Sequence, residues 1–165
     1  MAAMGKNEVL QYLDEQGVSY QKVEHEPVFT MEGMEQLNLP FAAEVVKNLF
    51  LRDDKKRAYY LVVMPEDKPA NLKALGEKLG GVRLSFASEE RLEKYLGLKK
   101  GAVTPLGILN DTACAVKVFL DKDFLEKEEI GVHPNDNTAS VYLKTADLMQ
   151  IIKEHGNSLE VLSFA

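Results

Sequence analysis

Three groups of residues in this chain have types and spacings that could do chemistry. Lys47 is a lone cation in an apolar, strand-like run, His133 lies in a loop of glycine, proline and asparagine, and Gly101–Asp111 holds two glycines and a proline within seven residues. An ammonium attracts anions, an imidazole exchanges protons near neutral pH, and a glycine-bearing loop brings bare backbone N–H and C=O groups close to a ligand. Together, these groups could bind and orient a small polar or anionic ligand.

The segment Gly101–Asp111, with the sequence GAVTPLGILND, forms a stiff bend between a charged helical stretch and a strand-like run. Gly101 and Gly107 can adopt backbone angles that other residues avoid, and Pro105 fixes its own φ and has no N–H to donate. The simpler interpretation is a tight connector between a helix and a strand. The alternative is a loop whose backbone contacts a ligand, and a second loop of the same character around His133 favours this alternative.

Lys47 stands among β-branched and apolar residues in the run 43–51. Strand alternation places it on the same face as Val45, Leu49 and Leu51, the apolar side of the strand. Burial of an unpaired ammonium is costly, so the side chain must either reach outward to solvent or enter a wet pocket and meet an anion. Both interpretations stay open from the residues alone.

His133 lies in the predicted loop 131–140, GVHPNDNTAS, whose composition fixes the backbone shape and supplies hydrogen-bonding groups. An exposed loop histidine is the simpler interpretation. Asn137, Thr138 and Ser140 add donors and acceptors that could orient a small polar ligand, which favours a functional histidine.

Several other mechanisms lack their parts. The chain has no Gly-x-Ser-x-Gly elbow, no His-Glu-x-x-His, no paired Cys-x-x-Cys and no phosphate-binding Gly-x-x-x-x-Gly-Lys-Ser/Thr. We therefore expect no metal and no other cofactor. Cys114 lies between two alanines at the start of a strand, where a small buried thiol is a simpler interpretation than a nucleophile. His25 and His155 have no polar loop around them and are predicted to lie on the surface.

Hydrophobic periodicity and turn signals predict a single compact α/β (α+β) domain over residues 1–165. Helices are predicted at 7–16, 30–39, 71–79, 88–97 and 145–155. Strands are predicted at 18–23, 43–51, 58–64, 82–86, 115–120, 140–143 and 159–164. Because several turns between strands are short, we expect a mixed, largely antiparallel sheet or open barrel of about seven strands, flanked by four to five helices.

Composition and charge narrow the class of protein. With 165 residues, 45% of them hydrophobic and 28% charged, the chain is typical of one globular domain. A single cysteine fits the reducing cytoplasm, and neither a signal peptide nor an apolar run of membrane-spanning length is evident. A net charge of −6 argues against sequence-blind adhesion to nucleic acid, so any nucleic-acid partner must be bound locally.

Three motifs occur in order along the chain: Lys47 within Val-Val-Lys-Asn-Leu, then Gly101-Ala-Val-Thr-Pro105, then Gly131-Val-His133-Pro-Asn-Asp-Asn137. Their combination resembles the prolyl-tRNA editing family, the YbaK-like domains, in which a strand lysine and two such loops surround the site. The resemblance runs along nearly the whole chain and is closest to the freestanding PrdX-type members, which hydrolyse alanyl-tRNA(Pro). It implies a compact mixed α/β domain and metal-independent hydrolysis of a mischarged aminoacyl ester. The chain is too short to hold synthetase domains as well, so action in trans is expected.

The resemblance also assigns roles to individual residues. Lys47 is implied to hold a phosphate or hydroxyl oxygen of the terminal adenosine, Gly101 to form the wall near the ester, and His133 to shape the amino-acid pocket or act as a general base. The implied substrate-binding residues are Ala102, Val103, Thr104, Pro105, Asn137 and Ser140. No stronger protein base is evident, so attack by a water assisted by a hydroxyl of the terminal ribose is the preferred mechanism.

The implied partner is the acceptor end of tRNA(Pro) carrying a small amino acid, with prolyl-tRNA synthetase as a further partner. A proline-sized synthetase pocket rejects a smaller amino acid poorly, since each missing methylene is worth only about 1–3 kcal/mol. A second site too small for proline would complete the discrimination. Two alternatives stay open: a deacylase for cysteinyl-tRNA(Pro) or another small misacylated amino acid, and a non-catalytic tRNA-binding module on the same fold. The editing interpretation requires the two loops and Lys47 to enclose one shared site.

Overall fold

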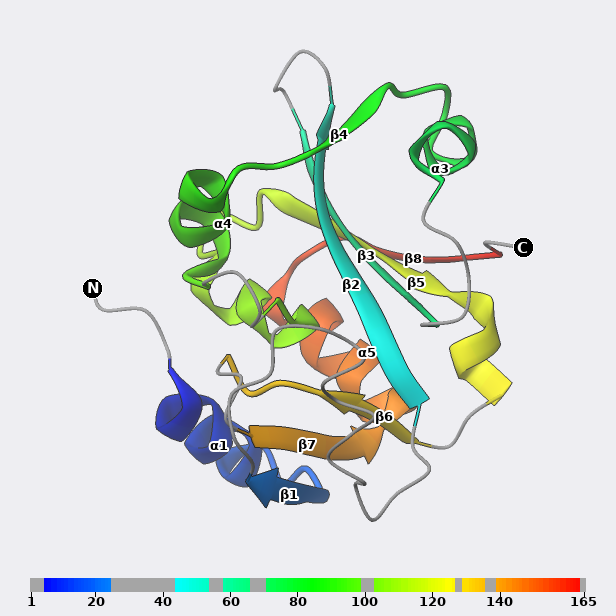
Figure 1. Ribbon diagram of the computed structural model, residues 1–165. Coiled ribbons are helices and arrows are strands. Elements are labelled where there is room, and N and C mark those ends of the chain that lie inside the picture. Colours follow the sequence, from blue (N-terminus) through cyan, green and yellow to red (C-terminus); the bar gives the residue numbers. More distant parts are fainter. Residues whose placement is uncertain are drawn as a thin grey trace.

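A computed structural model describes residues 5–24, 44–53, 58–65, 71–98, 103–126, 129–135 and 139–163 (Figure 1). Within these ranges the α-helices are α1 (Lys6–Glu15), α3 (Leu72–Lys78), α4 (Glu89–Leu96) and α5 (Thr145–His155), and the 3-10 helices are η1 (Pro105–Asn110) and η2 (Lys122–Glu126). The strands are β1 (Tyr20–Glu24), β2 (Glu44–Asp53), β3 (Tyr59–Pro65), β4 (Leu84–Phe86), β5 (Val116–Asp121), β6 (Glu129–Val132), β7 (Ala139–Lys144) and β8 (Leu159–Leu162).

Seven of the eight strands of the described residues form one hydrogen-bonded order, β1-β7-β6-β2-β3-β5-β8, and the eighth, β4, pairs with β2 outside this path. The pairs β2–β6, β3–β5 and β5–β8 are parallel, and the pairs β1–β7, β2–β3, β2–β4 and β6–β7 are antiparallel. The predicted mixed α/β sheet is therefore confirmed, with eight strands in place of about seven. The additional strand is β6, which lies at the start of the predicted loop 131–140.

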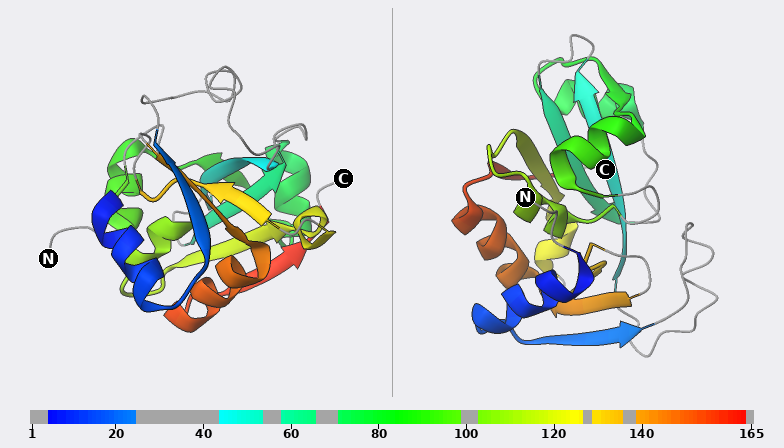
Figure 2. Two further views of the ribbon diagram at one scale, coloured as in Figure 1. Left: turned by 90° about the horizontal axis from the view of Figure 1, so that it is seen from below. Right: turned by 90° about the vertical axis from the view of Figure 1, so that its left-hand side faces the viewer.

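The long strand β2 connects two parts of the sheet. Its first residues pair with β6, and the rest of the strand pairs with β3 and β4. In Figure 1, β2 runs from the level of β6, β7 and β1 up to β4. Figure 2 shows the same arrangement from two further sides, with α1 beside β1 and β7 at one end of the molecule and α3 beside β2 and β3 at the other. β2 thus joins the part of the sheet that contains β6 to the part that contains β3 and β4.

Helix α4 shows how local sequence sets an element boundary. The Ser88 hydroxyl accepts a hydrogen bond from the Arg91 N–H at 3.2 Å, which satisfies a donor of the first turn. Gly97 ends the helix in the left-handed region with φ +62°, where a glycine is favoured. Both ends agree with the predicted helix at 88–97. Helix α1, by contrast, begins at Lys6 with Gly5 as its N-cap, one residue before the predicted helix at 7–16.

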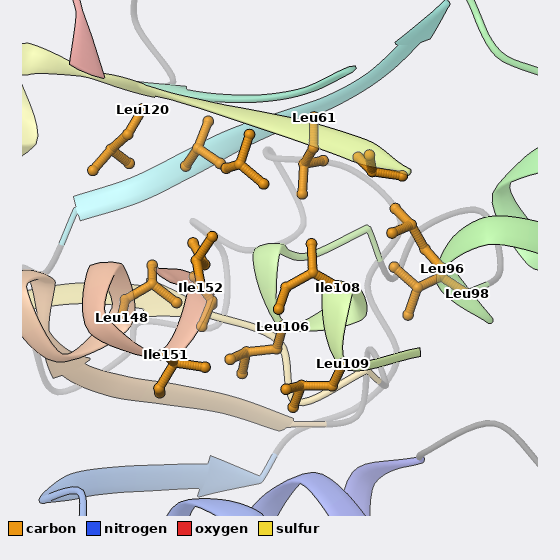
Figure 3. Packing of buried hydrophobic residues seen from close by; sticks show 14 of the residues in the cluster. Leu61, Leu96, Leu98, Leu106, Ile108, Leu109, Leu120, Leu148, Ile151 and Ile152 are labelled. Atoms are coloured by element: carbon orange, nitrogen blue, oxygen red, sulfur yellow. The ribbon is translucent and has the colours of Figure 1, made fainter. Parts of the chain in front are cut away.

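The predicted bend at Gly101–Asp111 is wrong in one respect, because its second half is the buried 3-10 helix η1. Figure 3 shows Leu106 and Ile108 of η1 beneath strand residues such as Leu61 and beside residues of α5 such as Ile152. All four belong to the main hydrophobic core. The second half of the predicted connector therefore lies in the hydrophobic core.

Gly107 in η1 was predicted to adopt backbone angles that other residues avoid. The structure shows that its role is in packing. Its φ is not in the left-handed region. A Cβ added to Gly107 would lie 2.6 Å from Leu98 Cδ1 and 3.2 Å from Leu96 Cβ. The glycine therefore allows η1 to pack closely against the end of α4.

The side chains on the two faces of β2 pack in two different hydrophobic clusters. Phe50 belongs to the main core, whereas Leu49 and Leu51 belong to a second cluster with Met64 of β3 and Leu75 of α3. The predicted alternation along this strand is therefore confirmed for Leu49 and Leu51. No helix within the described ranges is long and apolar enough to cross a bilayer.

Candidate functional site

The segment before η1 and the turn after β6 are joined by a hydrogen bond. The Thr104 hydroxyl donates to the His133 carbonyl oxygen at 2.7 Å, across 29 positions of sequence. The same hydroxyl accepts from the Leu106 N–H at 3.3 Å, and Thr104 has no exposed surface. The two loops that the sequence singled out therefore lie side by side, as one shared site requires.

The His133 ring is fixed by a second hydrogen bond. Its Nδ1 lies 2.9 Å from the carbonyl oxygen of Ala139 at the start of β7. A carbonyl oxygen can only accept, so Nδ1 carries a proton and donates. In the neutral imidazole, Nε2 is then the nitrogen with the lone pair, and it is the atom that could accept a proton from a water or hydroxyl.

Lys47 and His133 occupy corresponding positions after a pair of neighbouring residues in β2 and β6. The parallel strands β2 and β6 pair at Val45 and Gly131. Lys47 follows Val45 by two residues within β2, and His133 follows Gly131 by two residues just beyond the end of β6. Both follow in the same direction because the strands are parallel. The structure describes the main chain of Lys47 within β2 and does not describe its side chain.

Asn48, the next residue of β2, is a polar group that the sequence reasoning missed. Its Oδ1 is buried and has no hydrogen-bond partner among the described residues. A buried amide oxygen without a partner costs about 1–3 kcal/mol, so such an atom is a candidate ligand contact. The available signal was an amide beside Lys47 in a strand that is otherwise apolar.

Gly131 lies in β6, so the predicted loop 131–140 is wrong for its first two residues and for its end, which belongs to β7. Gly131 pairs with Tyr142 of β7, and a Cβ added to Gly131 would lie 2.7 Å from Cε1 of the tyrosine ring. Only a glycine leaves room for this ring. Burial raises the pKa of the Tyr142 hydroxyl above its ordinary value, because the phenolate would lose its solvation.

The structure places the remaining predicted site residues as follows. Pro105 is buried at the start of η1, and Val103 is half-buried against the main core. Ser140 lies in β7, and the structure describes only the main chain of this residue. Gly101, Ala102 and Asn137 lie outside the described residues. The roles assigned to these residues therefore stay predictions.

A second polar cluster lies at the other end of η1. The buried carboxylate of Asp111 accepts from the Val116 N–H at 2.8 Å and from Asn157 Nδ2 at 2.9 Å. Asn157 Nδ2 also donates to the Val116 carbonyl, so its Oδ1 must be the acceptor that faces His155 Nδ1 at 2.6 Å. Cys114 Sγ lies 3.8 Å from the same nitrogen.

This cluster corrects two predictions. Cys114 is partly exposed, with φ +52°, and is not a fully buried thiol. His155 is partly buried within the cluster and is not a simple surface residue. In the described part of the chain, no group of three or more His, Cys, Asp or Glu side chains could hold a metal ion.

Comparison with known proteins gives the family and the class of this protein. Residues 25–151 match the family model described as the aminoacyl-tRNA editing domain. The chain belongs to this family, and its class is that of an aminoacyl-tRNA deacylase.

Two relatives and one solved structure illustrate the match. The chain is 47% identical over 157 residues to the prolyl-tRNA editing protein ProX of Acetoanaerobium sticklandii, with 95% of this chain and 96% of ProX covered. It is 26% identical to the multifunctional Ser/Thr-tRNA deacylase ProXp-y of Escherichia coli, with 84% of this chain and 83% of that protein covered. A solved structure described as a candidate trans-editing enzyme for prolyl-tRNA synthetase superposes with a TM-score of 0.71 at 20% identity, with 99% of this chain and all of that chain covered. The structural likeness supports the fold.

Proposed function

We propose that this protein acts in trans to hydrolyse the ester that joins alanine to the 3′ end of tRNA(Pro). The observation that carries the proposal is the hydrogen bond from Thr104 to His133, because it brings both predicted loops to one place beside β2. The similarity to ProX, a prolyl-tRNA editing protein, over 96% of that protein's length supports tRNA(Pro) as the substrate. The cytoplasm is the proposed location, and prolyl-tRNA synthetase is the proposed partner that supplies the mischarged tRNA.

The proposed discrimination depends on size. The main chain of residues 101–105 would form a rigid wall beside the aminoacyl group, since η1 anchors its end in the core. A pocket bounded by such a wall admits the methyl group of alanine and excludes the proline ring. This second selection corrects the weak rejection of small amino acids by a proline-sized pocket.

Named side chains would hold the rest of the substrate. The ammonium of Lys47 would bind a phosphate or hydroxyl oxygen of the terminal adenosine. Asn137 and Ser140 would orient the polar atoms of the ester. Thr104 would contribute main-chain groups only, since its hydroxyl already makes two hydrogen bonds.

Hydrolysis would proceed by attack of water on the ester carbonyl carbon. The bond from the water oxygen to this carbon forms, the bond from the carbon to the ribose oxygen breaks, and that oxygen leaves with a proton. In the preferred version, the neighbouring ribose hydroxyl orients the water and relays its proton. In the competing version, His133 Nε2 takes the proton of the water as general base.

Replacement of the terminal adenosine by its 2′-deoxy form separates these two versions. Assistance by the ribose hydroxyl predicts that hydrolysis of 3′-linked alanyl-tRNA(Pro) falls at least about 100-fold with the deoxy form. A general base at His133 predicts a loss of less than about tenfold, since His133 is unchanged.

The amino acid is tested with tRNA(Pro) charged with alanine, cysteine, serine or proline. The proposal predicts fastest release of alanine and the slowest release of proline. Faster release of cysteine or serine would assign a different substrate to the same site, and the deacylase of Escherichia coli named for serine and threonine makes serine the main competitor. Binding of all four tRNAs without release would identify a non-catalytic module.

A further inference from the structure

We infer that Thr104 is a positioning residue for His133, and this inference rests on the proposed function. The Thr104 hydroxyl is a short donor to the His133 carbonyl oxygen at 2.7 Å and an acceptor for the Leu106 N–H at 3.3 Å. These two bonds fix the direction of the O–H. Because Thr104 is fully buried, bulk water cannot replace its hydroxyl if it is removed.

The helix η1 gives Thr104 a rigid base. Thr104 caps the N-terminus of η1, and its two neighbours in the sequence after the cap, Pro105 and Leu106, are buried. Leu106 and Ile108 have no exposed surface and pack in the main core. Close-packed interiors resist displacement, so the core determines where the Thr104 hydroxyl lies.

His133 is held at two points by elements that are far apart in sequence. Thr104 holds its main-chain carbonyl, and Ala139 in β7 holds its ring through Nδ1. Both bonds contribute to where Nε2 points. Loss of the first bond removes the contact that fixes the His133 main chain to η1, and a misplacement of about 1 Å in a reacting site costs about 100-fold in rate.

The test replaces Thr104 with valine, which has nearly the same shape but no hydroxyl, and with serine, which keeps the hydroxyl. With alanyl-tRNA(Pro) as substrate, Thr104→Val is expected to lower kcat about 10- to 100-fold with KM changed by less than about threefold. Thr104→Ser is expected to keep at least about half of the wild-type kcat, because its hydroxyl can make both hydrogen bonds. If valine does not fold, Thr104→Ala makes the same test, since alanine introduces no larger group.

Thr145 provides a matched control, because it is a buried threonine at the start of α5. Thr145→Val is expected to change kcat by less than about twofold even if it lowers the melting temperature. A wild-type kcat in the hydroxyl-free Thr104 variant would overturn the inference. An equal loss in Thr104→Ser or in Thr145→Val would also overturn it, since a general packing defect would then explain the result.

A second measurement does not need turnover. The imidazole ¹H–¹⁵N resonances of His133 in the full chain, assigned with a His133→Gln variant, are expected to shift in Thr104→Val and to stay in place in Thr145→Val. Unchanged resonances in Thr104→Val would overturn the positioning role. A wild-type protein that hydrolyses none of the aminoacyl-tRNAs would instead refute the proposed function, so the two failures are distinguishable.

Discussion

The ring of Tyr142 covers Gly131, so that a single methyl group on Gly131 would approach Cε1 of the ring to 2.7 Å. The two residues are direct partners in the antiparallel pair of β6 and β7. Gly131 also pairs with Val45 of β2. The requirement for glycine in the motif that leads to His133 is therefore steric, because the ring occupies the place of a side chain.

Gly131→Ala is expected to destabilise the protein by about 1–3 kcal/mol, because the added methyl overpacks against the tyrosine ring. Chemical denaturation measures this change. Gly5→Ala is the matched control, since a Cβ there would meet only Glu8 Oε2 at 3.4 Å, an ordinary contact. A second substitution, Tyr142→Leu, should recover part of the lost stability in the Gly131→Ala background. A Gly131→Ala variant as stable as the wild type would contradict the steric explanation.

Lys47→Ala is expected to lower the rate of alanyl-tRNA(Pro) hydrolysis by about 100-fold, because the proposed charged contact to the terminal adenosine would be lost. The melting temperature should change little. Hydrolysis and a thermal melt measured on the same preparation check both expectations. Lys117→Ala removes an exposed lysine from β5 and should leave the rate within about twofold. Unchanged turnover in Lys47→Ala would remove this residue from the site.

His133→Ala is expected to slow hydrolysis but to retain measurable activity, because the preferred mechanism uses the ribose hydroxyl. An imidazole base acts only in its neutral form, so a base role would make the rate rise with pH through about 6.5. Rates from pH 5.5 to about 8 for the wild type and His133→Ala distinguish the two roles. A wild-type rise through this window, together with no activity in His133→Ala, would establish the histidine as the base.

Asp111→Ala is expected to lower the free energy of unfolding by about 3 kcal/mol. The substitution leaves the Val116 N–H and the Asn157 side-chain amide without their buried acceptor. Denaturant unfolding measures the loss. Glu160→Ala removes an exposed carboxylate from β8 and should change the stability by less than about 0.5 kcal/mol. A similarly small effect in Asp111→Ala would show that the second polar cluster contributes little to the free energy of unfolding.

The free energy of unfolding should not change with the ionisation of Tyr142 near neutral pH and should fall above about pH 10. Burial raises the pKa of Tyr142 in the folded state, so the unfolded chain loses this proton first as the pH rises. The stabilisation is thus complete below the unfolded pKa and disappears as the pH rises through the folded value. Unfolding free energies from pH 8 to about 11 should fall less steeply for Tyr142→Phe. Equal slopes would contradict the effect of burial.

Local signals predicted most of the fold. The Ser88 cap and Gly97 stop of α4 are residues whose effects act within one helical turn, and the apolar stripe of α5 repeats over three turns. Strand β6 was missed because Gly131, Pro134 and Asn135 have the composition of a turn. The presence of glycine there depends on Tyr142, which belongs to another strand.

The structure of η1 was missed for a similar reason. With six residues, η1 is too short to show a helical period in the sequence, and Gly107 and Pro105 suggest a bend. Its burial is a result of packing against Leu98 and the strands, which no local pattern encodes.

The candidate site was predictable only in part. Lys47 and His133 were found from their types and neighbours, and the resemblance to a known family joined them. The contact between Thr104 and His133 spans 29 positions, and only the fold brings its partners together. Asn48 was not identified from the sequence. Its amide is a candidate ligand contact because its oxygen is buried without a partner among the described residues, and only the structure shows this.

The central claim is that two adjacent loops and the start of β2 form one site that removes a small residue, but not proline, from tRNA(Pro). Single-turnover hydrolysis of alanyl-tRNA(Pro) and prolyl-tRNA(Pro) by the wild-type chain tests it most directly. We expect alanine to be released at least about 100-fold faster than proline, and faster than in buffer alone. Equal rates for the two amino acids, or rates no higher than in buffer, would contradict the claim.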